Sequence, residues 1–329
     1  MATSTSTLRV ALIGTGRVGR IRARELNLRN DVRLVAVASH SLTRAQELAA
    51  PYQAEATTDW ETLVKRPDVD VVMVCTLNQQ HAPICEAALH ARKHTSVDYP
   101  AALSLAETQR LIDLARGQSI VFHVEHIELL APWFQALVNN LSKVGQPLAV
   151  LWGDLSARKP SLEDWTFNIN SGFSLFAGAS VLSRLIRLAG PAQWIDASET
   201  LVGTTDDGFF QSRFTTAHIG FANGVIGQIA DAAGLAVTGV SHALTIIGTQ
   251  GMLVAKNRQQ VKLAIGTEVI DILPMAHHLS HFAQDVTSFV EAIRLGKPTY
   301  VSLDHVLQVM QLADAAERSC REGRRVVLN

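Results

Sequence analysis

Short apolar runs alternate with helical patterns over the first 124 residues of the chain. The runs are rich in valine and other apolar residues, as strands buried on both faces are: 8–13, 33–38, 69–75 and 119–124. In the segments between them, apolar residues recur every three or four positions, as along one face of a helix: 18–28, 42–50, 82–91 and 105–116. Strands that alternate with helices predict an α/β fold with a doubly wound parallel sheet of the Rossmann type.

The pattern changes after a helical segment at residues 133–141. Residues 147–273 hold longer runs that alternate or are β-branched, and an Asn-Gly pair at 223–224 is a strong hairpin signal. One helix is predicted within this region, at 174–190, where a Gly-Pro pair marks its end. From 279 to 324 the period is helical again. The second part of the chain is therefore predicted to be an α+β domain on a mainly antiparallel sheet, with C-terminal helices that return to the first domain.

Length and composition add four constraints. A chain of 329 residues with 47% hydrophobic content exceeds one ordinary core, so two domains are predicted, at residues 1–126 and 127–329. Lys and Arg (29) nearly balance Asp and Glu (30), which argues against binding to nucleic acid or to a membrane surface. The three cysteines form neither a disulfide pattern nor a metal-ligand spacing. The polar N-terminus and the lack of ~18 consecutive apolar residues predict a cytoplasmic protein, whose oligomeric state the sequence does not determine.

A glycine-rich turn follows the first predicted strand. Gly14, Gly16 and Gly19 form the pattern G-x-G-x-x-G, with Arg17 and Val18 between them, directly before the first predicted helix. Glycines also serve ordinary tight turns, but a strand before the pattern and a helix after it are typical of a dinucleotide site. Gly14 then permits the turn, Gly16 lets the backbone approach the pyrophosphate at the helix N-terminus, and Gly19 allows the helix to pack closely on the strand.

The end of the second strand predicts which dinucleotide binds. A site for NAD usually has an Asp or Glu there, on the ribose 2′-hydroxyl, whereas this chain has Ser39 and His40, followed by Arg44. Ser39 can donate a hydrogen bond, and His40 or Arg44 can supply positive charge to a 2′-phosphate. NADPH is therefore favoured as the cofactor, with NADH binding more weakly. The alternative is that Arg44 is an ordinary exposed helix residue.

Polar residues also follow the strand at 69–75. Thr76, Asn78 and His81 lie in the stretch TLNQQH, at the carboxyl end of a predicted parallel strand, where ligands bind in such sheets. Together with KHTSVDYPAAL, which contains Asp98, this stretch resembles the nucleotide domain of the glucose-fructose oxidoreductase and inositol dehydrogenase family. The resemblance extends to the layout of the whole chain. It implies a Rossmann domain, an open-faced antiparallel sheet and returning helices, with these four residues at the cofactor.

Within that family the chain resembles the biliverdin reductase branch. Sugar and inositol dehydrogenases carry Glu-Lys-Pro where this chain has Asp98, Tyr99 and Pro100, so the lysine that would hold or deprotonate a sugar hydroxyl is absent. The tyrosine, the block HVEHIELL at 123–130 and the run SGFSLFAGAS at 171–180 resemble biliverdin reductases of the cyanobacterial type. The resemblance implies that NADPH delivers a hydride to the C10 methine carbon of biliverdin and that a pyrrole nitrogen gains a proton, which yields bilirubin.

The resemblance also implies candidate site residues. Tyr99, with an ordinary pKa near ~10, is a poor base and a better neutral donor that orients or polarises the bilin. Alternatively, it only packs its ring. Glu125 is expected to face the cleft as a further catalytic residue. The bilin carries two propionates and a flat π-system, so its site should supply cations and aromatic surface. The expected lining residues are His126, Trp165, Phe173 and Arg187, with Arg158 in the same region.

One position departs from the branch. Biliverdin reductases have Ser-Arg in the helix where this chain has Ser180 and Val181, and that arginine is a candidate proton donor and substrate anchor. Arg184, one turn later on the same face, is the expected catalytic substitute. Two alternatives follow: another NADP-dependent oxidoreductase of the superfamily with a different cyclic or conjugated substrate, or a non-catalytic sensor of a bilin or a nucleotide. No metal is expected, since His123 and His126 lack a third ligand at suitable spacing and hydride transfer needs no metal.

Overall fold

The chain divides into two compact units. The computed structural model describes residues 6–155, 159–161, 164–235, 241–274 and 277–328. Unit 1 consists of Met1–Ile127 and Leu279–Leu307, and unit 2 consists of Glu128–His278 and Gln308–Asn329. Each unit is built on one sheet. Within the described ranges, every helix is too short or too polar to cross a membrane.

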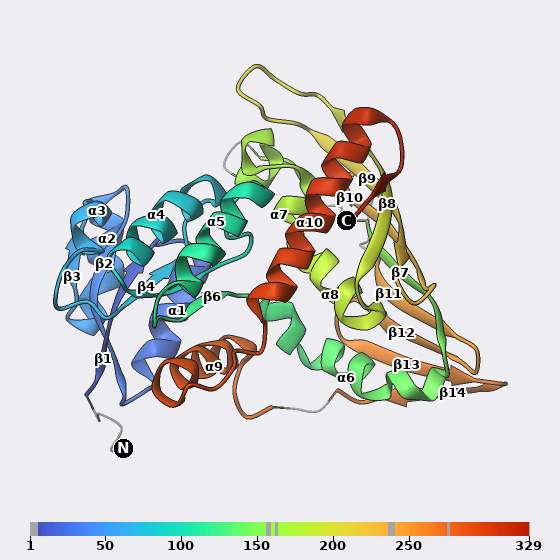
Figure 1. Cartoon of the computed structure of the whole chain (residues 1–329), viewed down its shortest axis with the longest axis horizontal. Helices are drawn as coiled ribbons and strands as arrows, with labels where there is room; N and C mark the ends of the chain where they lie inside the picture. Colours follow the sequence, from blue (N-terminus) through green and yellow to red (C-terminus); the bar gives the residue numbers. More distant parts are fainter. Residues whose placement is uncertain (1–5, 156–158, 162–163, 236–240, 275–276, 329) are drawn as a thin grey trace. The chain divides into compact units, whose positions relative to one another are not determined.

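Among the described residues, unit 1 holds six parallel strands in the order β3-β2-β1-β4-β5-β6. The Rossmann segment is drawn mainly in blue and teal in Figure 1. The strands are β1 (Leu8–Ile13), β2 (Val32–Ala38), β3 (Glu55–Thr57), β4 (Val71–Val74), β5 (His94–Val97) and β6 (Phe122–Val124). The helices are α1 (Arg17–Asn27), α2 (Leu42–Ala49), α3 (Trp60–Leu63), α4 (Asn78–His90), α5 (Leu105–Arg116), α9 (His281–Leu295) and the start of α10 (Leu303–Glu322). The strand order reverses between β1 and β4, so the predicted doubly wound sheet is confirmed.

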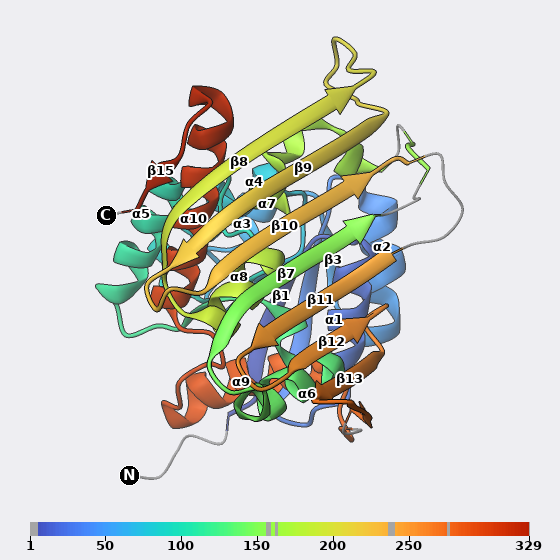
Figure 2. The same ribbon diagram turned by 90° about the vertical axis from the view of Figure 1, so that its right-hand side faces the viewer.

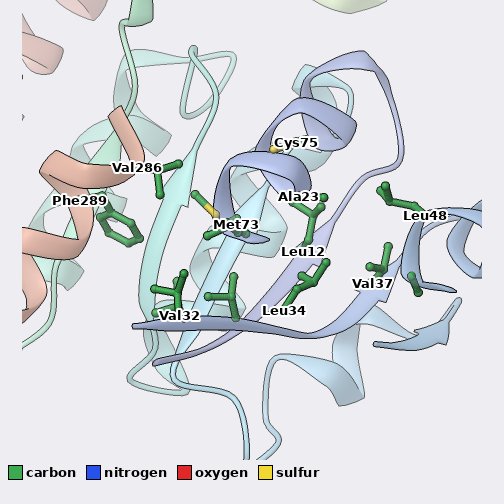
Figure 3. Packing of buried hydrophobic residues seen from close by; sticks show 14 of the residues in the cluster. Leu12, Ala23, Val32, Leu34, Val37, Leu48, Met73, Cys75, Val286 and Phe289 are labelled. Carbon is green, nitrogen blue, oxygen red and sulfur yellow. The ribbon is translucent and has the colours of Figure 1, made fainter. Parts of the chain in front are cut away.

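The core on one side of this sheet explains why α9 belongs to unit 1. Leu12 of β1, Leu34 of β2 and Met73 of β4 pack together with apolar side chains of α1 and α2 (Figure 3). Val286 and Phe289 of α9 complete the same cluster. Burial of each such side chain contributes roughly 1.5–3 kcal/mol, so the apolar face of α9 is sufficient to hold this late segment on the Rossmann sheet.

Unit 2 holds nine strands in the order β14-β13-β12-β11-β7-β10-β9-β8-β15, seen face-on in Figure 2. The strands are β7 (Pro147–Leu155), β8 (Ala192–Val202), β9 (Ser212–Phe221), β10 (Ile226–Ala233), β11 (Ser241–Gly248), β12 (Met252–Lys256), β13 (Gln260–Ile265), β14 (Glu268–Ile272) and β15 (Val326–Val327). The helices are α6 (Pro132–Asn140), α7 (Ser174–Ala177), α8 (Ala179–Ala189) and the rest of α10. Neighbouring strands are antiparallel, except that β7 and β10 are parallel, so the predicted mainly antiparallel sheet is confirmed.

One face of the second sheet is covered by helices and the other is open. Alternate side chains of β7, Val150 and Trp152, are buried on the covered face, where α8 packs on β7 and α6 packs on β12 and β13. On the opposite face, Phe214 of β9 and Leu155 of β7 are exposed. Figure 2 shows the strands from this open side. Alternate side chains of each strand therefore point to opposite faces of the sheet. Those on the covered face can build a site beneath the helices.

Two local predictions in unit 2 have different outcomes. The Asn-Gly hairpin is confirmed, because β9 and β10 pair antiparallel around a turn in which Gly224 has a φ of 85°. The single helix predicted at 174–190 is wrong, because the chain forms α7 and α8 with Gly178 between them. A Cβ at Gly178 would lie 2.9 Å from the carbonyl oxygen of Ser174, so the close backbone approach at the break needs a glycine.

Candidate active site

The glycine-rich turn of unit 1 leaves open space in front of a helix. Gly14 has a φ of 115°, and a Cβ there would lie 2.1 Å from the carbonyl oxygen of Cys75. A Cβ at Gly19 would lie 2.3 Å from the carbonyl oxygen of Gly14, so α1 and the turn approach one another closely. At Gly16, the N-cap of α1, nothing lies within 4 Å of the Cβ position. Arg17 and Val18 form the first turn of the helix.

This open N-terminus fits the pyrophosphate of a dinucleotide. The first backbone N–H groups of a helix have no partner within the helix and carry partial positive charge, which favours a phosphate. Thr15 adds a hydroxyl group to the turn, which bonds the hydroxyl of Ser39 at 2.9 Å. The residues present therefore fit a nicotinamide dinucleotide, whose reduced ring supplies a hydride when it is bound.

The end of β2 presents hydroxyl and basic groups instead of a carboxylate. Ser39 is buried and follows β2 directly, and its oxygen accepts a hydrogen bond from the N–H of Ser41 at 3.4 Å. His40 and Arg44 are exposed. Arg44 lies in the first turn of α2, which Ser41 caps. Because the Arg44 side chain is exposed, a phosphate at this edge of the sheet could reach it.

The turn after β4 is tied to the turn after β5 by a buried histidine. The Nδ1 atom of His81 lies 2.7 Å from the carbonyl oxygen of Pro100, and its Nε2 atom lies 3.1 Å from the carbonyl oxygen of Thr76. Asn78 is also buried, at the start of α4. His81 therefore holds two strand ends of the Rossmann sheet together, whether or not it also touches a cofactor.

A buried carboxylate, Asp285 of α9, binds three groups at the same end of the sheet. The guanidinium of Arg22 in α1 donates to it at 2.5 Å, the Nε2 atom of His123 lies 2.8 Å away, and the hydroxyl of Tyr300 donates to it at 2.9 Å. Arg22 also donates to Asp98, the residue after β5, at 3.2 Å. Burial raises the pKa of Asp285, but the charges of Arg22 and His123 outweigh it and hold that pKa below its usual value.

Tyr99 is connected to this carboxylate through its neighbours. Its ring lies parallel to the imidazole of His126, with the ring centroids 5.5 Å apart and an interplanar angle of 7°. The backbone N–H of His126 donates to the hydroxyl of Tyr300 at 3.1 Å, and Tyr300 donates in turn to Asp285. The predicted catalytic Tyr99 and the predicted substrate residue His126 are therefore held as one stacked pair.

Glu125 lies inside unit 1 and is almost fully buried. Its Oε2 atom accepts a hydrogen bond from the N–H of Ile127 at 2.5 Å. Burial, followed by the nearby charge of Asp98, raises the pKa of Glu125 well above its usual range, although Arg22 opposes the shift. A carboxyl in this setting holds its proton to a higher pH than an exposed carboxyl does.

A cavity of ≈ 330 Å³ lies within unit 2, on the covered side of its sheet. Its walls come from β7, β9 and β10, from α7 and α8, and from the turn between β12 and β13. Val181 and Arg184 both line it, as their shared helix face predicts. The charged lining residues are Asp154, Arg184, Arg213, Asp231 and Arg258.

Arg184 is the most deeply buried cation of this cavity. Its guanidinium lies over the ring of Trp152, 4.5 Å from the centroid, and 3.4 Å from the carboxylate of Glu128. Such a planar cation on an indole face is stabilised by the ring quadrupole and keeps its charge at any physiological pH. Arg184 therefore supplies fixed positive charge in the cavity wall.

Two further arginines, which the sequence did not single out, face the same space. Arg213 donates to Asp231 at 2.9 Å. Arg258 lies 3.5 Å from Asp154 and 3.6 Å from Glu128, and its Nε atom donates to the Nε2 atom of His242 at 3.1 Å. Burial, with the charges of Arg258 and Arg184, lowers the pKa of His242 to about 4, so this imidazole is neutral and can accept that bond.

Two other residues predicted for the substrate site, Arg187 and Phe173, do not line this cavity. Arg187 is exposed, and Phe173 packs edge-on against Phe176 with the ring centroids 6.5 Å apart. Trp165 belongs to a short 3₁₀ helix, but its side chain lies outside the described part of the structure, as does the whole of Arg158. Among the residues that are described, no three His, Cys, Asp or Glu side chains gather as metal ligands would.

Comparisons with known proteins find similar sequences and structures for both parts of the chain. The oxidoreductase family model (GFO/IDH/MocA) with an NAD-binding Rossmann fold matches residues 8–126, and the C-terminal alpha/beta domain of that family matches residues 204–328. The biliverdin reductase of Synechocystis sp. PCC 6803, solved with biliverdin and NADP+, is 30% identical with a TM-score of 0.90, over 95% of this chain and 99% of that chain. Biliverdin reductase A of Mus musculus is 33% identical over 57% of this chain and 60% of its own length. Myo-inositol 2-dehydrogenase of Thermotoga maritima is 22% identical over 98% of each chain.

The buried carboxylate of α9 generates a prediction about stability. Asp285→Asn should lower the free energy of unfolding by about 3–5 kcal/mol, because Arg22 would keep a buried charge without its closest partner. Asp304→Asn, which removes an exposed pair with Arg116 in the same unit, should cost less than about 1 kcal/mol. Urea unfolding followed by circular dichroism measures both variants. Because the folded pKa of Asp285 is lowered, its contribution should be lost only as the pH falls below about 3.9. Equal losses in the two variants would contradict the role given to Asp285.

The buried carboxyl of Glu125 generates a second prediction. Since its folded pKa is raised, its contribution to stability is complete below about pH 4.3 and is lost as the pH rises through the folded value. Glu125→Gln mimics the protonated form, so it should match the wild type in urea unfolding at acidic pH and exceed it at alkaline pH. A variant less stable than the wild type at alkaline pH would refute this assignment. A fall in turnover of ~10²-fold or more would identify Glu125 as a catalytic acid as well.

Proposed function

Because the chain belongs to the GFO/IDH/MocA family of NAD(P)-dependent oxidoreductases, we propose that it reduces biliverdin to bilirubin with NADPH. The observation that carries this proposal is the likeness to the Synechocystis biliverdin reductase, which extends over nearly the whole of both chains. The likeness includes both domains of this chain, since it covers 95% of its residues. Position 99 is a tyrosine in this chain, whereas the sugar and inositol dehydrogenases that it resembles have a lysine there. This difference also argues against a sugar or an inositol as the substrate.

On the cofactor side, unit 1 has groups suited to NADPH. The N-terminus of α1 at Gly16 and the backbone of Arg17 would hold the pyrophosphate. Ser39, His40 and Arg44 would hold the 2′-phosphate, which no carboxylate of β2 repels. Thr76, Asn78, His81 and Asp98 lie at or beside the carboxyl ends of β4 and β5, where we expect the nicotinamide half.

On the substrate side, the cavity of unit 2 has groups suited to a bilin. Arg213 and Arg258 would bind the propionates, because a guanidinium recognises a carboxylate through two parallel N–H groups. Arg258 makes only long contacts to Asp154 and Glu128, so it can exchange them for a substrate carboxylate. Arg184 would add charge without moving, since it is stacked on Trp152.

The reaction adds a hydride to the C10 methine carbon and a proton to a pyrrole nitrogen. Tyr99 would orient or polarise the substrate as a neutral donor, because a phenol with a pKa near ~10 is a weak acid at neutral pH. Its parallel stacking on His126 restricts the ring to one orientation, which suits a positioning role. Arg184 cannot release a proton, so the role that remains for it is electrostatic.

A second candidate is an oxidoreductase of the same family with a smaller, more polar substrate. The observation in its favour is that five of the described residues lining the cavity are charged, whereas a large flat π-system also needs apolar surface. Oxidation of myo-inositol with NADP+, followed by the absorbance of the reduced nicotinamide, would favour this candidate. A protein that binds bilin and NADPH without turnover would instead be a sensor.

The substrate proposal predicts a colour change and one variant that impairs it. Purified protein with NADPH should convert biliverdin to a yellow product, measured by visible absorbance. Arg258→Gln should raise KM for biliverdin by roughly 10–100-fold, as expected for loss of a charged hydrogen bond. Arg318→Gln is the matched control, because Arg318 of α10 is similarly exposed (42% against 45%) and also paired with an Asp. No loss of biliverdin with wild-type protein would rule out the proposed function.

The cofactor proposal predicts a preference that depends on Arg44. NADPH should bind more tightly than NADH, and Arg44→Ala should weaken NADPH binding while leaving NADH binding nearly unchanged, because only the 2′-phosphate meets this side chain. Titration of intrinsic tryptophan fluorescence with each cofactor measures the two affinities. Equal affinity of the wild type for the two cofactors would contradict the proposal.

A further inference from the structure

The proposed reaction requires a proton donor that the helix of unit 2 does not provide. Val181 lines the cavity at the position where the resembling enzymes have an arginine, and its side chain has no proton to give. Arg184 lines the cavity too, but a guanidinium is not deprotonated in proteins. Among the described residues of the cavity wall, the other groups that can release a proton near neutral pH are two carboxyls, those of Asp154 and Asp231.

These two aspartates lie side by side on parallel strands. Asp154 of β7 and Asp231 of β10 are direct partners in the strand register, and both side chains line the cavity. Adjacent strands lie ≈ 4.8 Å apart, so the two carboxyls share one small region of space. Two carboxyls at such a distance do not both ionise easily, because the negative charge of one raises the pKa of the other. The proton stays on the carboxyl that has the weaker interaction with a neighbouring cation.

The neighbouring charges determine which carboxyl keeps the proton. Asp231 has a close ion pair, with Arg213 of β9 at 2.9 Å. Among the residues that the structure describes, Asp154 has a longer ion pair, with Arg258 at 3.5 Å. Its register partner on β11 is the neutral His242, and the charge of Arg184 on α8, which also pairs with Glu128, acts on it from the helix side. Burial and the charge of Asp231 raise the pKa of Asp154, and this outweighs the lowering by Arg258 and Arg184.

A second feature of this wall is a buried hydrogen-bond donor without a partner. The indole N–H of Trp152 is buried and makes no hydrogen bond with any residue that the structure describes. Trp152 lines the cavity and lies two residues before Asp154 on β7, so both side chains are on the same face, ~6.6 Å apart along the strand. A buried donor without a partner costs ~1–3 kcal/mol, which a ligand oxygen would remove. A bilin carries such oxygens in its terminal lactam rings.

We propose that Asp154 is the catalytic acid that protonates the substrate nitrogen, with Asp231 as the residue that positions and tunes it. This inference rests on the proposed function. The hydride, which would leave a C–H bond of NADPH with both electrons, forms a new C–H bond at the methine carbon, and the π electron pair displaced there moves through the conjugated system to the pyrrole nitrogen. The O–H bond of Asp154 breaks, an N–H bond forms on the pyrrole nitrogen, and the electron pair stays on the Asp154 carboxylate. Solvent then returns a proton to Asp154 before the next turnover.

The direct test is Asp154→Asn, which keeps the shape of the side chain and removes its acidic proton. The rate of bilirubin formation in a single turnover with NADPH should fall by ~10²–10⁴-fold, as expected for the loss of a general acid, while biliverdin still binds. Asp154→Glu should restore part of the rate. Asp196→Asn, on the exposed face of β8 in the same sheet, should leave the rate unchanged. A rate equal to that of the wild type in Asp154→Asn overturns the proposal.

A pH profile separates this role from a structural one. The rate in the wild type should decline as the pH rises, because the donor loses its proton, and this decline should be absent from Asp154→Asn. Asp231→Asn removes a neighbouring negative charge and should move the decline to lower pH. Arg258→Gln removes a positive charge and should move it to higher pH. Opposite displacements support the proposal, and displacement in one direction or none overturns it, whether or not Asp154→Asn folds.

The outcomes also separate this inference from the proposed function. If wild-type protein does not reduce biliverdin, the proposed function fails and the proton donor fails with it. If the wild type reduces biliverdin and Asp154→Asn does so at the same rate, the function stands and only the donor is wrong. Circular dichroism of each variant shows that a lost rate is not a lost fold.

Discussion

The buried carboxylate of Asp285 is the interaction on which the cofactor edge of unit 1 depends. A carboxylate without water is costly unless it is paired and hydrogen-bonded, and here Arg22, His123 and Tyr300 all bind it. These groups come from α1, from β6 and from the segment after α9. Since Arg22 also reaches Asp98, one network holds the helix after the glycine turn, two strand ends and the late helix α9 together. The stacked pair of Tyr99 and His126 is attached to it through Tyr300.

Charge has a different role in the cavity of unit 2. There the side chains of Arg258, Asp154 and Asp231 are partly exposed, and the contacts of Arg258 to carboxylates are 3.5 Å and 3.6 Å long. Loose, partly exposed pairs contribute little to stability, and they can exchange a protein partner for a ligand. Unit 1 therefore uses buried ion pairs to hold a site rigid, whereas the cavity of unit 2 keeps the charges of Arg258 and Asp154 available.

The two departures from the resembling enzymes are chemically related. Tyr99 stands where the sugar and inositol dehydrogenases that the chain resembles have a lysine, so this chain has no amine at that position. Val181 replaces an arginine of the biliverdin reductases, and the proposed compensation comes from strands, not from the helix. A carboxyl on β7 can take over because the cavity is shared by β7, β10 and α8, so a group on any of these elements can reach the same ligand.

The sequence by itself determined the fold class, because alternation and helical period are local properties of the chain, and it determined the glycine turn and the Asn-Gly hairpin for the same reason. The sequence also contained an indication of the cavity. Asp154, Arg213 and Asp231 each lie two residues from a buried residue of the same strand, so they are on its inward face. Charged residues at positions where alternation predicts apolar side chains indicate a site. Only the tertiary structure decided that these three meet, because β7 and β10 are distant in sequence and their parallel register brings Asp154 beside Asp231. It likewise decided that Arg184 is buried while Arg187 is exposed, since α8 is enclosed by its neighbours at every position except Arg187.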